Sequence, residues 1–282
     1  NGSKILDGSI PYAMAYAGHQ FGYFVPQLGD GRAINLGSVN NWHLQTKGSG
    51  LTRYSRQGDG RAVLRSSIRE YLMSEAMFGL GIPTTRALAI IDSDSFAHRE
   101  WEQESCAIVL RMSPSWIRVG TFEFFARSRD KETIFQLADY VIKQSYSHLE
   151  NEENKYEKMF YSLVDKTAEL LAKWQVYGFQ HGVMNTDNFS VAGLTIDYGP
   201  YAFMDYFEKN AICNHTDAEG RYSYNNQPYV ARWNLFALIN ALKLICDESK
   251  LESYMKAFLP QHEKVYLDLM NKRLGLDALK SG

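Results

Sequence analysis

The sequence predicts an α+β fold with two lobes, a strand-rich N-terminal lobe over residues 1–125 and a helical C-terminal lobe over residues 126–282. Three observations support this prediction. The chain of 282 residues is longer than most domains with a single core. Short apolar runs rich in β-branched residues fill its N-terminal part. Stretches with helical periodicity follow from about residue 133.

In the predicted N-terminal lobe we expect strands at residues 42–47, 84–92 and 106–112 and a helix at 62–80. The first strand alternates polar and apolar residues, and the helix has apolar residues at helical spacing before Gly81 and Pro83. Residues 92–104 are polar and are expected to form a surface loop. Residues 29–32, Gly-Asp-Gly-Arg, are typical of a hairpin turn, because Asp-Gly tolerates the positive φ of tight hairpins.

In the predicted C-terminal lobe one helix starts near residue 133 and a longer one leads to Gly178. Residues 200–228 are expected to be irregular, and helices should follow at 229–246, 250–259 and 261–274.

Composition argues against several kinds of partner. The 30 Lys and Arg residues nearly balance the 32 Asp and Glu residues, so we expect no general attraction to nucleic acid or to an anionic membrane. No run approaches the roughly 18 apolar residues of a membrane span, and no cleavable signal pattern opens the chain. The cysteines, Cys106, Cys213 and Cys246, lack C-x-x-C spacing and have apolar neighbours. We expect them to be buried, reduced thiols in a reducing compartment.

Oxygen-bearing side chains gather in residues 181–200, HGVMNTDNFSVAGLTIDYGP. Asp187, Asn188 and Asp197 suit Mg²⁺ carrying a polyphosphate, because this cation needs only one or two protein carboxylates beside the substrate's own oxygens. The sequence therefore predicts a site for a metal-bound nucleotide.

The same stretch follows the spacing of the protein-kinase loop H-R-D-L-x-x-x-N, with His181 and Asn188 in matching places and Asp197 where the aspartate of D-F-G would stand. The catalytic aspartate of kinases falls on Val183, which cannot accept a proton. We therefore expect either an inactive protein or one that catalyses a different reaction on a nucleotide.

A phosphate-binding region is predicted around Lys47, at the end of a strand as in kinases. Its acidic partner is expected on the following helix, and Glu70 is favoured over Glu75. Two Gly-Asp-Gly-Arg loops, residues 29–32 and 58–61, bracket this lysine and would let backbone N–H groups approach phosphates. Arg111 and Arg118 would either clamp phosphates or form surface salt bridges, and their spacing leaves both open.

Many spaced runs, among them YAGHQFG, QLGDGRA, GDGRAVLRSSIREYLMSEAM, HGVMNTDN, DYGP and QPYVARWNL, together resemble the selenoprotein O family over about residues 16–245. The resemblance implies a protein-kinase-like two-lobed fold and a protein adenylyltransferase. Such an enzyme moves AMP from ATP to Ser, Thr or Tyr hydroxyls of proteins and releases pyrophosphate, with the nucleotide inverted relative to a kinase. It also implies a longer C-terminal helical region, so the C-terminal lobe is expected to be truncated.

The resemblance also implies the roles of individual residues. Asn188 and Asp197 would bind Mg²⁺ or Mn²⁺, Glu70 would pair with Lys47, and Asp187 would accept the proton of the attacking hydroxyl. The expected ATP-binding residues are Gly29, Gly31, Arg32, Lys47, Asp59, Gly60, Arg111 and Arg118.

Alternatives stay open at this point. UMP transfer with Mn²⁺ cannot be separated from AMP transfer, because contacts to the nucleobase are not legible in the sequence. Phosphoryl transfer to a small molecule is disfavoured by Val183, and an inactive nucleotide-binding scaffold is disfavoured by the intact set of Lys47, Asn188 and Asp197. The expected compartment is the cytoplasm for a bacterial protein and the mitochondrion for a eukaryotic one.

Overall fold

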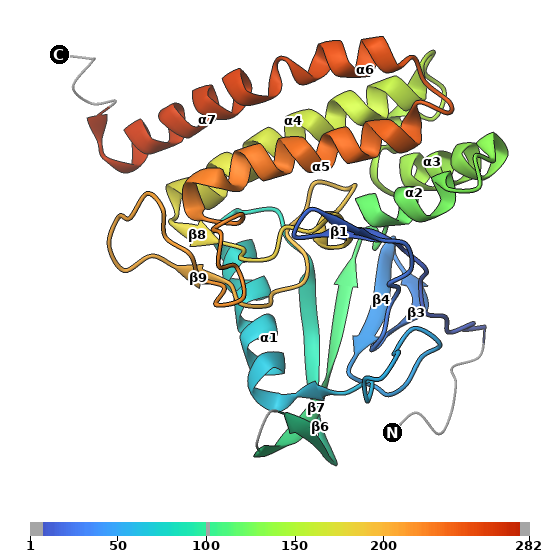
Figure 1. Cartoon of the computed structure of the whole chain (residues 1–282), viewed down its shortest axis with the longest axis vertical. Coiled ribbons are helices and arrows are strands. Elements are labelled where there is room, and N and C mark those ends of the chain that lie inside the picture. The colour runs from blue at the N-terminus through green and yellow to red at the C-terminus, as the bar shows by residue number, and fades with distance from the viewer. Residues whose placement is uncertain (1–7, 100–101, 277–282) are drawn as a thin grey trace.

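A computed structural model describes residues 8–99 and 102–276, and it has the mixed α+β composition that the sequence predicts. Strands and one helix make up the N-terminal part, and a group of helices makes up the C-terminal part (Figure 1). The boundary at residue 125 stays a prediction.

The main sheet has five antiparallel strands: β3 (Ala33–Val39), β4 (Trp42–Lys47), β5 (Ala62–Val63), β6 (Arg86–Arg99) and β7 (Glu102–Ser113). Strand β7 is its centre. Because β6 pairs along one edge of β7 over almost its whole length, β4 and β5 share the other edge, one after the other. Lys47 at the end of β4 is thereby held beside Val109 of β7.

The expected surface loop at residues 92–104 is wrong in its described part. Strands β6 and β7 continue as a long hairpin, with pairs from Ser93 and Cys106 out to Arg99 and Glu102. Residues 100–101 of that prediction lie outside the described residues. The backbone hydrogen bonds of the ladder hold this extension, and most of its side chains are exposed, so an apolar pattern could not predict it.

The hairpin expected at residues 29–32 is also wrong. Strand β3 instead pairs with β4 through a turn at Asn40 and Asn41, whose φ angles are +49° and +65°. Asparagine tolerates these angles, so the pair can form the tight turn that Asp-Gly was expected to make. Asp30 is buried instead and accepts hydrogen bonds from the backbone N–H of Met14 and from Gln45.

Helix α1 (Leu64–Gly79) matches the expected helix and packs on β6 and β7. The helical part contains α2 (Val119–Ala126), α3 (Lys131–Ser145), α4 (Lys155–Val176), α5 (Gln227–Leu242), α6 (Glu248–Met255) and α7 (Phe258–Arg273). Helix α2 was not predicted. Its eight residues, VGTFEFFA, are mostly apolar and too few to show a clear helical period.

Short elements lie between the sheet and the helices (Figure 1). They are the hairpin of β1 (Gly18–Gln20) and β2 (Tyr23–Val25), the pair β8 (Phe179–Gln180) and β9 (Ala202–Phe203), and the 3₁₀ turns η2 (Thr186–Asn188) and η3 (Tyr224–Asn226). A further 3₁₀ turn, η1 (Ser147–Leu149), joins α3 to α4. Turn η2 carries Asp187 and Asn188, so the predicted metal site lies in this middle layer.

One large apolar core joins α2, α3, α4 and α5. The three cysteines are free, but only Cys106 is buried, and Cys213 and Cys246 are half-buried rather than buried as expected. Within the described residues, no helix combines the length and the apolar character needed to cross a membrane.

The core makes a stability prediction. Phe160 of α4 is fully buried, and Phe160→Ala should lower the free energy of unfolding by about 3–5 kcal/mol, because it leaves a cavity. The matched change Phe207→Ala removes a ring that is 70% exposed and should change it by about 0.5 kcal/mol. Urea denaturation of both variants measures the difference, and equal losses would contradict this placement of α4.

Candidate functional site

A cavity of about 1100 Å³ opens between the main sheet, α1 and the middle layer. Every residue predicted for the site lines it except Asp187. The lining residues come from segments that are far apart in the sequence, and the fold brings them together: Gly29, Gly31, Arg32, Lys47, Asp59, Gly60, Glu70, Arg111, Arg118, Asn188 and Asp197.

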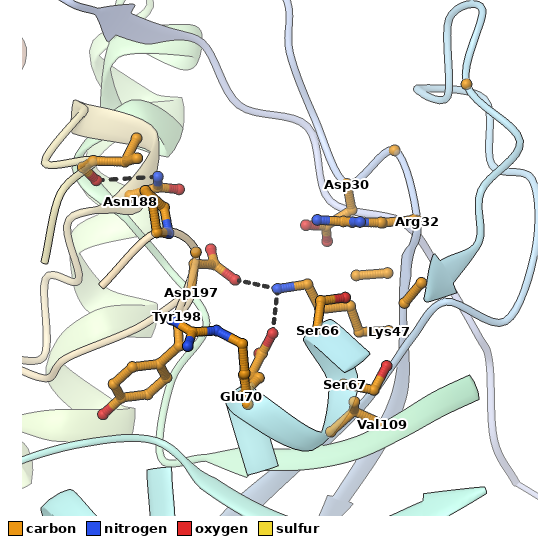
Figure 2. Close-up of a pocket in the computed structure, with 18 of the residues that line it drawn as sticks. Asp30, Arg32, Lys47, Ser66, Ser67, Glu70, Val109, Asn188, Asp197 and Tyr198 are labelled. Atoms are coloured by element: carbon orange, nitrogen blue, oxygen red, sulfur yellow. Dashed lines mark hydrogen bonds and ion pairs between the residues drawn. The ribbon is translucent and has the colours of Figure 1, made fainter. Parts of the chain in front are cut away.

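Lys47 is the residue that connects the two sides of the cavity (Figure 2). Its Nζ lies 2.6 Å from Oε2 of Glu70 and 3.3 Å from Oδ1 of Asp197. The predicted choice of Glu70 over Glu75 agrees with this geometry, because Glu75 binds Arg86 instead. Burial lowers the pKa of Lys47, and the two carboxylates act against that shift.

Arg111 and Arg118 are buried, with 3% and 2% of their surface exposed, so the surface salt bridges considered for them are wrong. Nη1 of Arg111 lies 2.8 Å from Glu70 and 2.6 Å from Oδ1 of Asp197. Nη1 of Arg118 lies 2.7 Å from Oδ2 of Asp197. The arginines also lie over the rings of Trp116 and Tyr16, respectively.

Asp197 therefore receives three cationic partners. Burial alone would raise its pKa, but Arg111, Arg118 and Lys47 outweigh burial and hold the pKa well below its ordinary value. Glu70 follows the same logic, because Lys47 and Arg111 overcome its burial and lower its pKa. Both carboxylates are thus ionised at neutral pH.

A sharp turn aims Asp197 into the cavity. Its φ of +57° lies in the left-handed region, which aspartate tolerates better than most residues. The next side chain, Tyr198, points the other way into the core and makes a hydrogen bond with Thr84. The aspartate and tyrosine at these two positions are therefore separated by the turn, one toward the cavity and one toward the core.

The two glycine loops are tightly packed. A Cβ on Gly29 would lie 2.4 Å from the ring of Tyr54, and a Cβ on Gly60 would lie 2.2 Å from the backbone of Gly50. The carboxylate of Asp59 forms a partly exposed ion pair with Arg99 at 2.7 Å. A short strand, β5, separates the second loop from α1, so the loop does not lead directly into the helix.

Sequence reasoning missed several basic residues of the cavity. Arg65 and Arg69 line it from α1, and Arg99 lines it from β6. Arg61 lines it too and belongs to the predicted loop at residues 58–61, but it was not singled out. The i, i+4 spacing of Arg65 and Arg69, next to Glu70, was the available signal, because it puts both on one helix face.

The loop at residues 181–188 is held by its own hydrogen bonds. Nε2 of His181 donates to the carbonyl of Ile196 at 2.8 Å, and Nδ1 accepts from the backbone N–H of Val183. Burial lowers the pKa of His181, which favours the neutral ring that these bonds need. Nδ2 of Asn188 donates to the carbonyl of Val183, which leaves Oδ1 of the amide for a ligand.

Asp187 lies beside the cavity without lining it. Its Oδ1 is buried and has no hydrogen-bond partner within the described part of the chain. Burial raises the pKa of Asp187 to about 6, although nearby Arg118 acts to lower it. Gly18 makes room for this residue, since a Cβ there would lie 2.3 Å from Oδ1 of Asp187. Gly120 lets the backbone of Ala17 approach, since a Cβ there would lie 2.1 Å from the Ala17 carbonyl.

The donor set fits a hard divalent cation. Such a cation prefers carboxylate and amide oxygens and can take its remaining ligands from a polyphosphate. Asn188 and Asp197 offer one amide oxygen and one carboxylate, and Asp187 adds a buried oxygen without a partner nearby. Within residues 8–99 and 102–276, no cluster of three or more His, Cys, Asp and Glu side chains could hold a metal by itself.

Comparison with known proteins identifies the family. The sequence profile of the family described as "Protein adenylyltransferase SelO" matches residues 2–282. The chain belongs to the SelO family. This assignment agrees with the resemblance to selenoprotein O that the motifs indicated.

Bacterial SelO relatives are similar along almost the whole chain. A protein of Pseudomonas aeruginosa strain LESB58 named "Protein nucleotidyltransferase YdiU" is 51% identical over 280 residues, which is 98% of this chain and 57% of the relative. Proteins of the same name from Pseudomonas entomophila and Myxococcus xanthus are 50% and 49% identical, over 98% of this chain and 58% and 57% of their own lengths. The chain thus spans a little over half the length of these relatives.

The close approach of Gly18 to Asp187 can be tested. Gly18→Ala should lower the free energy of unfolding by about 1–3 kcal/mol, because the new methyl group overlaps the Asp187 side chain. Gly79→Ala is the matched control, since a Cβ there meets nothing within 4 Å and the residue ends helix α1. Urea denaturation compares the two. A Gly18→Ala protein as stable as the parent would contradict the contact between β1 and Asp187.

Proposed function

We propose that this SelO chain transfers AMP from ATP to Ser, Thr or Tyr hydroxyls of proteins and releases pyrophosphate. The family description and the name of the relatives support nucleotidyl transfer. The family also implies a protein-kinase-like arrangement, with the nucleotide bound between a sheet-containing lobe and a helical lobe. Bacterial relatives favour the cytoplasm as the compartment.

The observation that carries the proposal is the pairing of a complete charge set with a missing kinase base. Lys47, Asn188 and Asp197 all line the cavity. Val183 lines it too, at the position where a kinase has the aspartate that accepts the proton of the attacking hydroxyl. A cavity built for a metal-bound polyphosphate but without that base suits attack at another phosphorus.

The basic side chains that line the cavity would supply cationic partners for the phosphates of ATP. Lys47 and Arg111 form ion pairs with Asp197 in this structure, and the phosphates of ATP would compete with Asp197 for these two cations. Arg61, Arg65 and Arg69 extend the positive lining along the start of α1, where an inverted nucleotide would place its β- and γ-phosphates. A bound Mg²⁺ or Mn²⁺, held by Asn188 and Asp197, would neutralise part of the phosphate charge.

The reaction then needs one bond to form and one to break. The acceptor oxygen bonds to the α-phosphorus, and the bond from that phosphorus to the bridging oxygen of the leaving pyrophosphate breaks. Asp187 takes the hydroxyl proton, directly or through a water molecule. Its position one residue before Asn188 puts this proton acceptor next to the metal-binding side of the cavity.

Two alternatives belong to the same site. The relatives are named nucleotidyltransferases without a stated nucleotide, so UMP transfer with Mn²⁺ is the second candidate. An inactive nucleotide-binding scaffold is the third.

Labelled nucleotides distinguish these candidates. In the presence of Mg²⁺ and a mixture of acceptor proteins, label at the α-phosphate of ATP should become bound to protein, and label at the γ-phosphate should not. A parallel tube with Mn²⁺ and α-labelled UTP tests the second candidate. Label transferred from the γ-phosphate to protein would show kinase activity and refute the interpretation of Val183. ATP binding without any transfer of label would support the inactive scaffold.

Asp197→Ala should abolish the α-label transfer, because it removes a metal ligand and the partner of three cations. Asp268→Ala, on the exposed side of α7, is the matched control and should keep full transfer. Transfer by Asp197→Ala at the parent rate would contradict the proposed metal site.

The ion pair of Lys47 gives a second test. Glu70→Gln should lower the transfer rate at least tenfold, because Lys47 and Arg111 lose the carboxylate that holds both in place. Glu75→Gln changes the same residue type on the same helix but breaks only the pair with Arg86, outside the cavity. Its rate should stay within about twofold of the parent, since it touches no cavity residue. Equal transfer rates for Glu70→Gln and Glu75→Gln would show that the carboxylate of Glu70 is not needed for the reaction.

A further inference from the structure

The N-terminal hairpin is bonded to the loop that carries Asp187. The backbone N–H of His19 in β1 donates to Oγ1 of Thr186 at 2.7 Å, although the two residues are 167 positions apart. The N–H of Phe21 donates to the side chain of Asn185 at 3.2 Å. Strand β1 therefore lies directly against turn η2.

The hydroxyl of Thr186 is the centre of a closed network. Thr186 is fully buried, and its Oγ1 also lies 2.5 Å from Oε2 of Glu123 in helix α2. A backbone N–H can only donate and an ionised carboxylate can only accept, so the hydroxyl must accept from His19 and donate to Glu123. The other carboxylate oxygen of Glu123 lies 2.5 Å from Nδ1 of His19. Every oxygen of the network is thus used.

This network does not belong to the nucleotide cavity. Neither His19 nor Glu123 nor Thr186 lines it. Nor does packing demand the network, because valine would fill the space of Thr186 with apolar atoms. A buried carboxylate is costly unless it is hydrogen-bonded, and such groups hold a local geometry when every partner is satisfied.

The network fixes the position of Asp187. Thr186 is its neighbour, and the carbonyl of Asp187 itself accepts from Arg118, the residue that caps helix α2, at 2.7 Å. Gly18 of β1 also lies against the Asp187 side chain, since a Cβ at Gly18 would lie 2.3 Å from its Oδ1. Helix α2 and strand β1 therefore fix the residue from both sides, in the backbone and in the side chain.

We propose that Thr186 and Glu123 are positioning residues, which hold Asp187 at the distance and angle from which it accepts the proton of the acceptor hydroxyl. The inference rests on the proposed function of Asp187. It adds two residues and the N-terminal hairpin to the machinery of the reaction, and it assigns them no contact with ATP.

The test compares Thr186→Val, which removes the hydroxyl at equal volume, with Thr186→Ser, which restores it. Hydrogen–deuterium exchange of the amides of residues 183–189 should accelerate at least tenfold in Thr186→Val and return toward the parent in Thr186→Ser. The kcat for α-label transfer should fall about 10- to 100-fold in the valine variant, since small displacements of a reacting group have effects of this size. The KM for ATP should stay within about twofold.

A matched control is available in helix α4. Thr167 is also buried, and its Oγ1 makes no hydrogen bond within the described residues. Thr167→Val makes the same chemical change without breaking a network, so it should alter neither exchange at residues 183–189 nor kcat. Glu123→Gln gives a second variant if Thr186→Val does not fold. Glutamine has the volume of glutamate, but only one of its two terminal atoms can accept a hydrogen bond.

The two proposals fail differently. Parent-like exchange and parent-like kcat in both Thr186→Val and Glu123→Gln would overturn the positioning role while leaving nucleotidyl transfer intact. A rise in the KM for ATP with unchanged kcat would overturn it too, because the network would then serve nucleotide binding. If the parent protein transfers no label to any acceptor, the proposed function fails. The exchange rates of Thr186→Val and Glu123→Gln then test by themselves whether the network fixes the loop at residues 183–189.

Discussion

The site depends on a buried charge cluster in which Lys47, Arg111 and Arg118 face Glu70 and Asp197. Three formal cations meet two anions, so the cluster has an excess of one positive charge. Burying charges is costly unless each is paired, and the excess makes a further anion the natural partner of this cavity. Pairing all of these charges requires the sheet, helix α1 and the turn after Ile196 together, so the complete cluster forms only when these parts of the chain have folded.

Chemistry was easier to predict from the sequence than geometry. Lys47 and Glu70 could be paired in advance, because a lysine at the end of a strand followed by a glutamate in the next helix resembles the order found in kinases. Asp197 and Asn188 could be grouped because they are close in sequence. The burial of Arg111 and Arg118 could not be predicted, because it follows from long-range packing of β7 and α2 against the middle layer.

The failures have a common physical cause. Local propensity predicted a hairpin at residues 29–32. Asp30 is instead buried and bonded to the backbone N–H of Met14 and to the side chain of Gln45, and these bonds set the conformation of the segment. The extension of β6 and β7 is held by backbone hydrogen bonds, which leave no trace in hydropathy. Gly18 matters only because Asp187 lies against it, 169 positions later. Local sequence cannot report contacts of this separation.

The loop at residues 181–188 is held from two directions. On the cavity side, His181 is bonded to the carbonyl of Ile196, the residue before Asp197, and Asn188 is bonded back to Val183. On the opposite side, β1 and α2 hold Thr186 and the carbonyl of Asp187. Asp187 is thus fixed partly through β1, which does not line the nucleotide cavity, and partly by Arg118, which does. Strand β1 thereby supports the loop that carries Asp187, through the N–H of His19 on Thr186. The N-terminal hairpin is therefore a structural part of the site.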